Sequence, residues 1–135
     1  MTTTISGSCA CGAVHVAIDG DAAGPYQCFC RQCQHASGGG PATFVMVAKD
    51  KVRVDGEVTS YEETTQSGNR ASRSFCAKCG TAIYSEPAKS AGAMMVKLGV
   101  IDNPPWDTVK AAFWISEKPA WFSLPPEVKQ FPTQP

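Results

Sequence analysis

The sequence lacks a charge excess, a leader-like start and any long apolar run. Its 12 basic and 12 acidic residues balance, which argues against a protein that binds nucleic acid through a basic surface. Residues 1–5 (MTTTI) contain no basic segment and no apolar core, so no signal peptide is expected. The apolar stretch 94–101 is short and contains Lys97, whereas a membrane span needs about 18 apolar residues. We therefore expect a soluble cytoplasmic protein that acts on neither nucleic acid nor membranes.

The composition is typical of one globular domain. Hydrophobic residues make up 43% of the 135 residues and charged residues 18%, which excludes a disordered chain. A chain of this length suits a single core. We expect one domain over residues 1–135, with a proline-rich tail from about residue 125 that wraps the surface. Three tryptophans are expected in the core or in a lid: Trp106, Trp114 and Trp121.

Short segments of alternating apolar and polar residues predict a mainly β fold of small antiparallel sheets. Turn residues such as Asp55-Gly56 and Ser67-Gly68-Asn69 separate them, as in sandwiches, barrels and tent-like folds. Strands are predicted within 14–18, 41–48, 52–54, 58–65, 70–75, 82–85, 94–101 and 112–116. Residues 20–25 are predicted to turn, and 106–112 suit either a loop or a helical turn. One short helix is predicted over 31–36, ended by the glycines after Ser37.

Seven cysteines in three clusters are the strongest chemical signal. The clusters are Cys9-x-Cys11, Cys28-x-Cys30-x-x-Cys33 and Cys76-x-x-Cys79. In a reducing compartment, clustered cysteines are more often metal ligands or redox groups than disulfides. A closed zinc site takes four ligands, and a site with three protein ligands keeps one position for water or substrate. Seven cysteines therefore suggest four plus three, and two zinc ions per chain.

Glycines suggest how the seven cysteines divide. Cys11 and Cys79 are each followed by glycine, Gly12 and Gly80. A zinc knuckle needs a tight turn after its second cysteine, and glycine tolerates the positive φ that such a turn often requires. Two such knuckles, far apart in sequence, are well suited to share one structural zinc that ties the first strands to the later ones. Because structural zinc contributes roughly 10–16 kcal/mol in zinc-finger peptides, chelation is expected to unfold the protein.

The middle cluster has a different character. It places three thiols within six residues, with no glycine directly after the last. Three thiolates can bind zinc from one side and leave the other side to substrate. His35, Ser37 and Thr43 are the nearest candidates for proton handling, and His35 and Ser37 are our candidate catalytic residues.

Other interpretations of the middle cluster stay open. His35 could complete a closed Cys₃His site, which would make the protein a non-catalytic zinc-binding module. A disulfide within the cluster would instead indicate a thiol-redox or metal-buffering protein. Spacing alone does not decide which cysteines share an ion, and it leaves the occupancy of the second site open.

These motifs resemble those of the glutathione-dependent formaldehyde-activating enzyme family, also called the centromere-protein-V domain family. The resemblance covers residues 5–131 and rests on four segments: 7–14 (GSCACGAV), 28–38 (CFCRQCQHASG), 75–81 (FCAKCGT) and 114–121 (WISEKPAW). It implies a β-tent fold with two zinc ions. By motif match, the structural zinc would be held by Cys9, Cys11, Cys76 and Cys79, and the catalytic-type zinc by Cys28, Cys30 and Cys33.

The resemblance also implies an activity. Members of the family condense formaldehyde with glutathione to S-hydroxymethylglutathione, formally a carbon–sulfur lyase reaction, so the implied partners are a small thiol and a small aldehyde. The chain departs from the family pattern at two positions. Family members often carry histidine where this chain has Phe29, and also where it has Ala112.

Overall fold

Strands dominate the structure. A computed structural model describes residues 4–87 and 92–134, in which eleven strands and one α-helix occur. The predicted mainly β fold with one short helix is confirmed. No helix within these ranges has the length and apolar character that a membrane crossing requires. The elements are β1 (Thr4–Ser8), β2 (His15–Asp19), β3 (Ala23–Cys28), α1 (Arg31–Ser37), β4 (Ala42–Ala48), β5 (Val52–Asp55), β6 (Val58–Thr64), β7 (Arg70–Cys76), β8 (Ala82–Pro87), β9 (Ala93–Lys97), β10 (Ala111–Phe113) and β11 (Lys129–Gln130).

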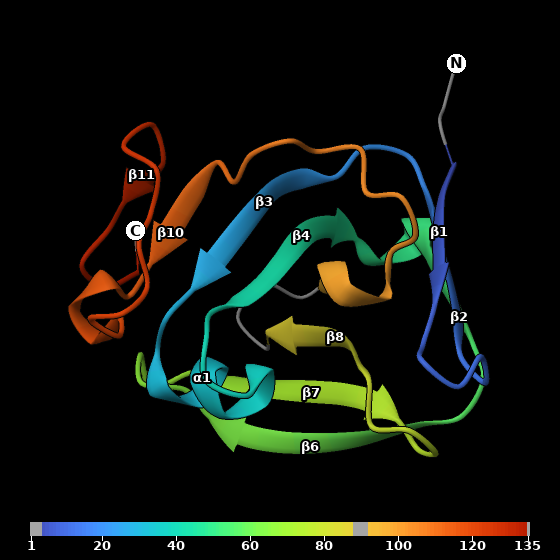
Figure 1. Ribbon diagram of the computed structural model, residues 1–135. Coiled ribbons are helices and arrows are strands. Elements are labelled where there is room, and N and C mark those ends of the chain that lie inside the picture. Colours follow the sequence, from blue (N-terminus) through green and yellow to red (C-terminus); the bar gives the residue numbers. More distant parts are fainter. Residues whose placement is uncertain (1–3, 88–91, 135) are drawn as a thin grey trace.

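The strands form two sheets (Figure 1). β1, β2 and β5 make a three-stranded antiparallel sheet. The other eight strands make one sheet in the order β11-β10-β3-β4-β9-β8-β7-β6. Its neighbours are antiparallel except for β10, which runs parallel to both β3 and β11. Figure 1 shows the small sheet on one side of the molecule and β10 and β11 on the other.

The main core lies between the small sheet and one face of the large sheet. Valine and isoleucine side chains alternate along the strands, so that every second residue enters the core. From the small sheet, Val16 and Ile18 of β2 are buried. From the large sheet, Val45 and Val47 of β4 and Val96 of β9 meet them in the same cluster.

The opposite face of the large sheet carries a different set of residues. Neighbouring strands place Arg73 opposite Ser85, Ser85 opposite Met95, and Lys97 opposite Phe44. Partners in register point to the same side of a sheet. The face that does not join the main core is therefore partly polar, and the candidate site described below lies on it.

Two predictions about the first strands were incomplete. β1 was not predicted, and the turn predicted over 20–25 was wrong in its second half, because Gly24 and Pro25 lie inside β3. The register of β3 against β4 shifts between Ala23 and Tyr26, which is a bulge. A bulge accommodates glycine and proline within a strand, although both residues are more common in turns.

Several element ends also differ from expectation. The strand predicted over 94–101 ends at Lys97, and a 3₁₀ helix, η3 (Leu98–Val100), follows. The strand predicted over 112–116 ends at Phe113, because Trp114 has a left-handed φ of 59° and η4 (Ile115–Glu117) comes next. Residues 106–110 form a loop. The tail does more than wrap the surface, since β11 joins the large sheet beside β10.

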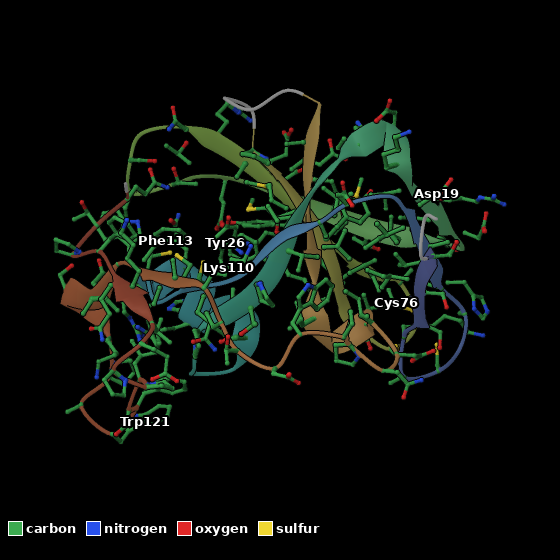
Figure 2. The ribbon with its side chains drawn as sticks, turned by 90° about the horizontal axis from the view of Figure 1, so that it is seen from above. Asp19, Tyr26, Cys76, Lys110, Phe113 and Trp121 are labelled. Carbon is green, nitrogen blue, oxygen red and sulfur yellow. The ribbon has the colours of Figure 1, made fainter. Side chains whose placement is uncertain are left out.

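The three tryptophans lie in different environments. Trp106 packs against the main core, and Trp114 packs against the cluster of Cys30, Cys33 and Ala42. Trp121 is 70% exposed and lies at the outer edge of the molecule, away from Tyr26 and Phe113 (Figure 2). The expected core or lid position is therefore wrong for Trp121.

A buried glycine in β1 gives a test of the sheet packing. A β-carbon at Gly7 would lie 1.7 Å from the carbonyl oxygen of Val100, whereas one at Gly99 would meet nothing within 4 Å. We expect Gly7→Ala to lower the free energy of unfolding by about 1–3 kcal/mol, because two backbone segments must separate. The control Gly99→Ala should change it by less than about 0.5 kcal/mol. Thermal denaturation measures both, and equal melting temperatures for the two variants would contradict this packing.

Candidate functional site

Two tight loops bring four cysteines together from distant parts of the chain. They are Cys9 and Cys11 in the β1–β2 loop and Cys76 and Cys79 in the β7–β8 loop. In each loop a glycine N–H donates to a cysteine carbonyl: Gly12 to Cys9 and Gly80 to Cys76, both at 3.0 Å. The two glycines have φ of 80° and 78°, which glycine adopts at little cost. The structure thus joins the four cysteines that the glycine pattern had grouped.

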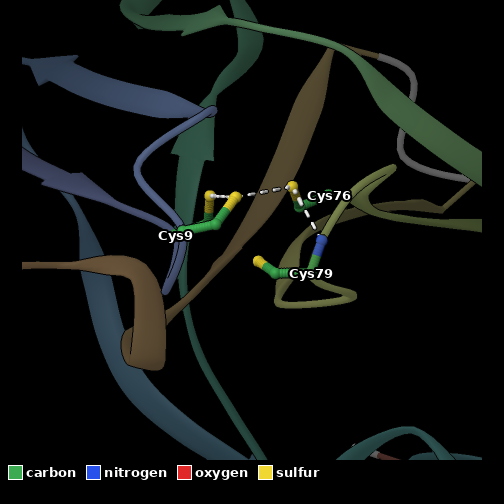
Figure 3. Close-up of side chains that lie close together, drawn as sticks. Cys9, Cys76 and Cys79 are labelled. Atoms are coloured by element: carbon green, nitrogen blue, oxygen red, sulfur yellow. Dashed lines mark hydrogen bonds between the residues drawn. The ribbon is translucent and has the colours of Figure 1, made fainter.

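Backbone N–H groups point at the sulfurs of this group. The N–H of Val14 donates to Cys9 Sγ at 3.3 Å, and those of Lys78 and Cys79 donate to Cys76 Sγ at 3.4 Å each. Figure 3 shows the contact from the Cys79 N–H. Such donors favour the negatively charged thiolate, which is the form that binds a metal.

The spacing of the four sulfurs fits zinc. Four thiolates around a tetrahedral zinc, with Zn–S distances near 2.3 Å, lie about 3.8 Å apart. Cys9 Sγ and Cys11 Sγ are 3.6 Å apart, and Cys11 Sγ and Cys76 Sγ are 3.8 Å apart (Figure 3). All four sulfurs lie within 4.8 Å of one another. The group can therefore close around one zinc ion with no remaining coordination position.

Thr81 connects the two loops and was not identified from the sequence. Its hydroxyl oxygen accepts from the Ala10 N–H at 3.2 Å and lies 3.1 Å from Cys79 Sγ. Hydrogen bonding by Thr81 lowers the pKa of Cys79 to about 5. The only sequence signal for this contact between the loops is that Thr81, a residue with a hydroxyl group, directly follows the pair Cys79-Gly80.

The remaining three cysteines lie where β3 meets α1. Cys28 ends β3, Cys30 is the N-cap of α1, and Cys33 lies in its first turn. The Cys33 N–H donates to Cys30 Sγ at 3.4 Å. The three sulfurs lie within 4.8 Å of one another, and in the described part of the chain this group contains no histidine, aspartate or glutamate. We call these three residues the cysteine triad; they offer a metal three ligands.

Arg73 on β7 is the charged neighbour of the cysteine triad. Its Nη2 lies 3.8 Å from Cys33 Sγ, and its Nε donates to the largely buried Glu63. Hydrogen bonds from Cys28 and Cys30, followed by the charge of Arg73, lower the pKa of Cys33 well below its usual range, against the opposing effect of burial. The pKa of Cys28 is raised, because its thiol bonds to Cys30 and Cys33. One thiolate is thus already favoured before any metal binds.

A cavity of about 380 Å³ opens beside the cysteine triad. It lies over the partly polar face of the large sheet, and the segment between β6 and β7 forms part of its wall. Four aromatic side chains line it, and three of them are linked by ring contacts of 5.6 and 6.0 Å between centroids. The four are Tyr26, Phe44, Phe113 and Trp114. A cavity of this size, largely apolar with a few polar groups, suits a small organic ligand.

Lys97 places an ammonium group in this cavity. Its Nζ lies 5.3 Å from the centre of the Phe44 ring. Burial lowers the pKa of Lys97 to about 8, although the charges of the cysteine triad oppose that shift. The amine is therefore still mostly protonated at pH 7, and it lies in a largely apolar surrounding.

The two cysteine groups lie in different parts of the molecule. Cys76 lies well away from Tyr26 and Phe113, which mark the cavity (Figure 2). The four-cysteine group connects loops and is not among the residues that line this cavity, whereas all three members of the cysteine triad line it. This arrangement suits a structural role for the first group and a chemical role for the second.

The structure places the candidate proton carriers outside the cavity. His35 and Ser37 are exposed on α1, and neither lines it. The Ser37 hydroxyl donates to the carbonyls of Gln34 and Gly40, and Thr43 accepts from Gln27 Nε2 at 3.3 Å. The ring nitrogens of His35 do not lie with the three sulfurs of the cysteine triad. The geometry therefore does not support a closed Cys₃His site completed by His35. The catalytic role of His35 and Ser37 stays a prediction.

The two positions that differ from the family pattern are fully buried. Phe29 and Ala112 are both 0% exposed and pack with Val128 in a small apolar cluster. The Phe29 ring meets Phe122 edge-on, with centroids 5.0 Å apart. Although Phe29 lies between two cysteines of the triad in sequence, it does not line the cavity.

Lys97 and Arg73 line the cavity but were not predicted as site residues, although the sequence contains a partial signal for each. Lys97 is the one charged residue in the apolar stretch 94–101, and alternation along β9 puts it on the face opposite Val96. Arg73 lies near a cysteine cluster in sequence, but only the pairing of β7 with β8 places it on the cavity face. Local sequence does not show such cross-strand neighbours.

Metal content should separate the two cysteine groups. We expect two zinc ions per chain, and unfolding when a strong chelator removes them, because the four-cysteine group joins distant loops. Cys30→Ser should lose about one of the two ions and stay folded, since serine preserves the N-cap of α1. Cys79→Ser should lower the melting temperature strongly. Elemental analysis and circular dichroism measure these outcomes; retention of both ions by Cys30→Ser would contradict the assignment.

Lys97 gives a prediction about pH. The unfolded chain holds the Lys97 proton with the ordinary pKa of 10.5 and the folded chain with a pKa of about 8. The charge therefore costs stability at pH 7, and the cost shrinks as pH rises from about 8 to 10.5. Lys97→Met should raise the free energy of unfolding at pH 7 by about 1–3 kcal/mol, with a smaller gain at pH 10. Denaturant titrations at both pH values measure the gain.

Lys129 is the matched control for that prediction. Its Nζ lies 5.4 Å from the Phe131 ring centre, yet the residue is exposed. Lys129→Met should leave the free energy of unfolding within about 0.5 kcal/mol of the wild-type value. A gain for Lys97→Met that is no larger than for Lys129→Met would show that Lys97 carries no burial cost.

Comparisons with known proteins agree with this architecture. A crystal structure of a Rhodobacter sphaeroides protein is similar in fold, with a TM-score of 0.59 and 21% sequence identity over 73% of this chain and 89% of that one. A search of the curated proteins finds no match. Residues 4–117 match the family described as glutathione-dependent formaldehyde-activating enzyme. The chain belongs to this family.

Proposed function

We propose that this protein is a zinc-dependent enzyme that joins a small thiol to a small aldehyde, or reverses that reaction, in the manner of a carbon–sulfur lyase. Glutathione and formaldehyde are the substrates that its family suggests. The observation that carries the proposal is the cysteine triad, whose three sulfurs lie together on the wall of a cavity of about 380 Å³. Three ligands leave a tetrahedral metal with one position for substrate.

The reaction is an addition. The thiol sulfur forms a bond to the aldehyde carbon, the carbonyl electron pair moves to oxygen, and the thiol proton ends on that oxygen. The difficult part is supplying a thiolate at neutral pH. A zinc ion held by the cysteine triad would supply it by lowering the pKa of a thiol bound beside the three sulfurs.

The residues of this chain support that step in distinct ways. Arg73 fixes Cys33 through the Nη2 contact of 3.8 Å and is itself held by Glu63. Tyr26, Phe113 and Trp114 line the cavity with rings and limit the access of water to the thiol. The three triad thiolates donate strongly to any metal they hold, which favours delivery of a thiolate over strong polarisation of the aldehyde.

An adduct assay tests the proposal. Isotope-labelled formaldehyde and glutathione are mixed with the zinc-loaded protein, and NMR follows the approach of the adduct to equilibrium. We expect the wild-type protein to accelerate it and Cys30→Ser to give only the uncatalysed rate. Circular dichroism checks that the variant is folded. An equal acceleration by Cys30→Ser would exclude the cysteine triad as the reaction site.

Two further variants test the candidate proton carriers. A loss of turnover in His35→Ala or Ser37→Ala, with zinc content unchanged, would support a catalytic part for these residues. Their exposed positions on α1 make them easy to replace without disturbing the core. Unchanged turnover would assign proton transfer to groups that line the cavity.

A further inference from the structure

We propose that Lys97 and Ser85 form a carboxylate-binding subsite in the cavity, so that the thiol substrate carries a carboxylate that Lys97 holds. The inference rests on the proposed function for the thiol part of the substrate. The subsite itself rests on the placement of both residues, the charge of Lys97 and the hydroxyl of Ser85, which has no hydrogen-bond partner in the described structure.

Placement is the first step. Lys97 on β9 is in register with Phe44 on β4, and Phe44 is in register with Tyr26 on β3. Cys28 ends the same strand β3, two residues beyond Tyr26. Two strand spacings, about 10 Å, therefore separate the strand of Cys28 from the strand of Lys97. A small molecule lying across this face can reach the cysteine triad at one end and Lys97 at the other.

Charge is the second step. The other positively charged residues on the cavity wall are two arginines, and each already has a carboxylate partner. Arg70 pairs with Glu62. Arg73 pairs with Glu63 and also contacts Cys33. Lys97 has no ion-pair partner among residues 4–87 and 92–134, and the residues that line the cavity there include no aspartate or glutamate. An ammonium group in a largely apolar surrounding is costly when no carboxylate pairs with it. An anionic group on the ligand would offset that cost.

Ser85 supplies the third step. It is 2% exposed and lines the cavity, and its hydroxyl oxygen has no hydrogen-bond partner in the described structure. Ser85 is in register with Met95, two residues before Lys97 on the same face of β9. Buried hydroxyl groups are normally hydrogen-bonded. One ammonium and one hydroxyl match a singly charged carboxylate, which accepts hydrogen bonds from both.

A competing role for Lys97 is to balance the charge of the cysteine triad. In that case the residue would favour every thiol that binds there, whether or not the thiol carries a carboxylate. The two roles therefore predict different results with a matched pair of ligands that differ only in charge.

The test uses 3-mercaptopropionate and its neutral amide, 3-mercaptopropanamide, with calorimetry on the zinc-loaded protein. We expect the wild-type protein to bind the acid at least about tenfold more tightly than the amide, as one charge-assisted contact would give. Lys97→Met should bring the two affinities within about twofold of each other. Ser85→Ala should reduce the preference while leaving the protein folded. The control Lys129→Met, whose lysine lies over a ring outside this cavity, should retain it.

Each other outcome is decisive. Equal binding of acid and amide by the wild-type protein, or an unchanged preference in Lys97→Met, would overturn the subsite. Equal weakening of both ligands in Lys97→Met would make Lys97 a counter-charge for the cysteine triad and overturn it too. Butanoate and butanamide, which lack the thiol, separate the two proposals: a Lys97-dependent preference for butanoate over butanamide, with 3-mercaptopropionate bound no more tightly than butanoate, would refute the proposed function and leave the subsite standing. Failure of all four ligands would refute the subsite.

Discussion

The contact between two Cys-Gly loops is the interaction on which the arrangement of the sheets depends. One loop connects strands of the small sheet, and the other connects β7 and β8 of the large sheet. Cys11 and Cys76, 65 residues apart in sequence, bring their sulfurs to 3.8 Å. Closing so long a segment costs chain entropy, and four sulfurs at this spacing suit one zinc ion that would offset the cost. The main core packs between the same two sheets, so the loops and the core reinforce each other.

One face of the large sheet packs against the main core, and the candidate site lies on its other face. Val45, Val47 and Val96 point into the core, while their strand neighbours Phe44 and Lys97 line the cavity. Polar groups on this second face make the fold less stable, because the buried Ser85 hydroxyl has no hydrogen-bond partner and the half-buried Lys97 has no ion-pair partner among the described residues. Such costs are common where a site must bind a ligand. The period of two along each strand therefore separates the residues that hold the fold from those that form the site.

The sequence predicted chemistry better than topology, for physical reasons. A Cys-Gly knuckle is formed by a few consecutive residues, so Gly12 and Gly80 identified the four-cysteine group. The close spacing of Cys28, Cys30 and Cys33 identified the cysteine triad in the same local way. β3 was not recognisable from the local sequence. Gly24 and Pro25 usually indicate a turn, and the bulge that allows them to lie within a strand depends on the pairing of β3 with β4. Lys97 could be placed on a strand face but not beside the cysteine triad, because that depends on β4 lying between β3 and β9. The parallel pairing of β10 with β3 was equally invisible, since it joins segments from opposite ends of the chain.

The departures from the family pattern and the tail belong to one apolar cluster. Phe29 and Ala112, the two positions at which the resemblance led us to expect histidine, are both fully buried. They pack with Val128, Phe122 and Leu124, which lie beyond the family match of residues 4–117. A histidine at position 29 or 112 would lie in this apolar cluster, where burial disfavours its charged form. The tail thus packs against both of these positions in one apolar cluster. Neither position lines the cavity, whose polar lining includes the cysteine triad, Arg73, Lys97 and Ser85, and we expect these groups to contribute to the specificity of the site.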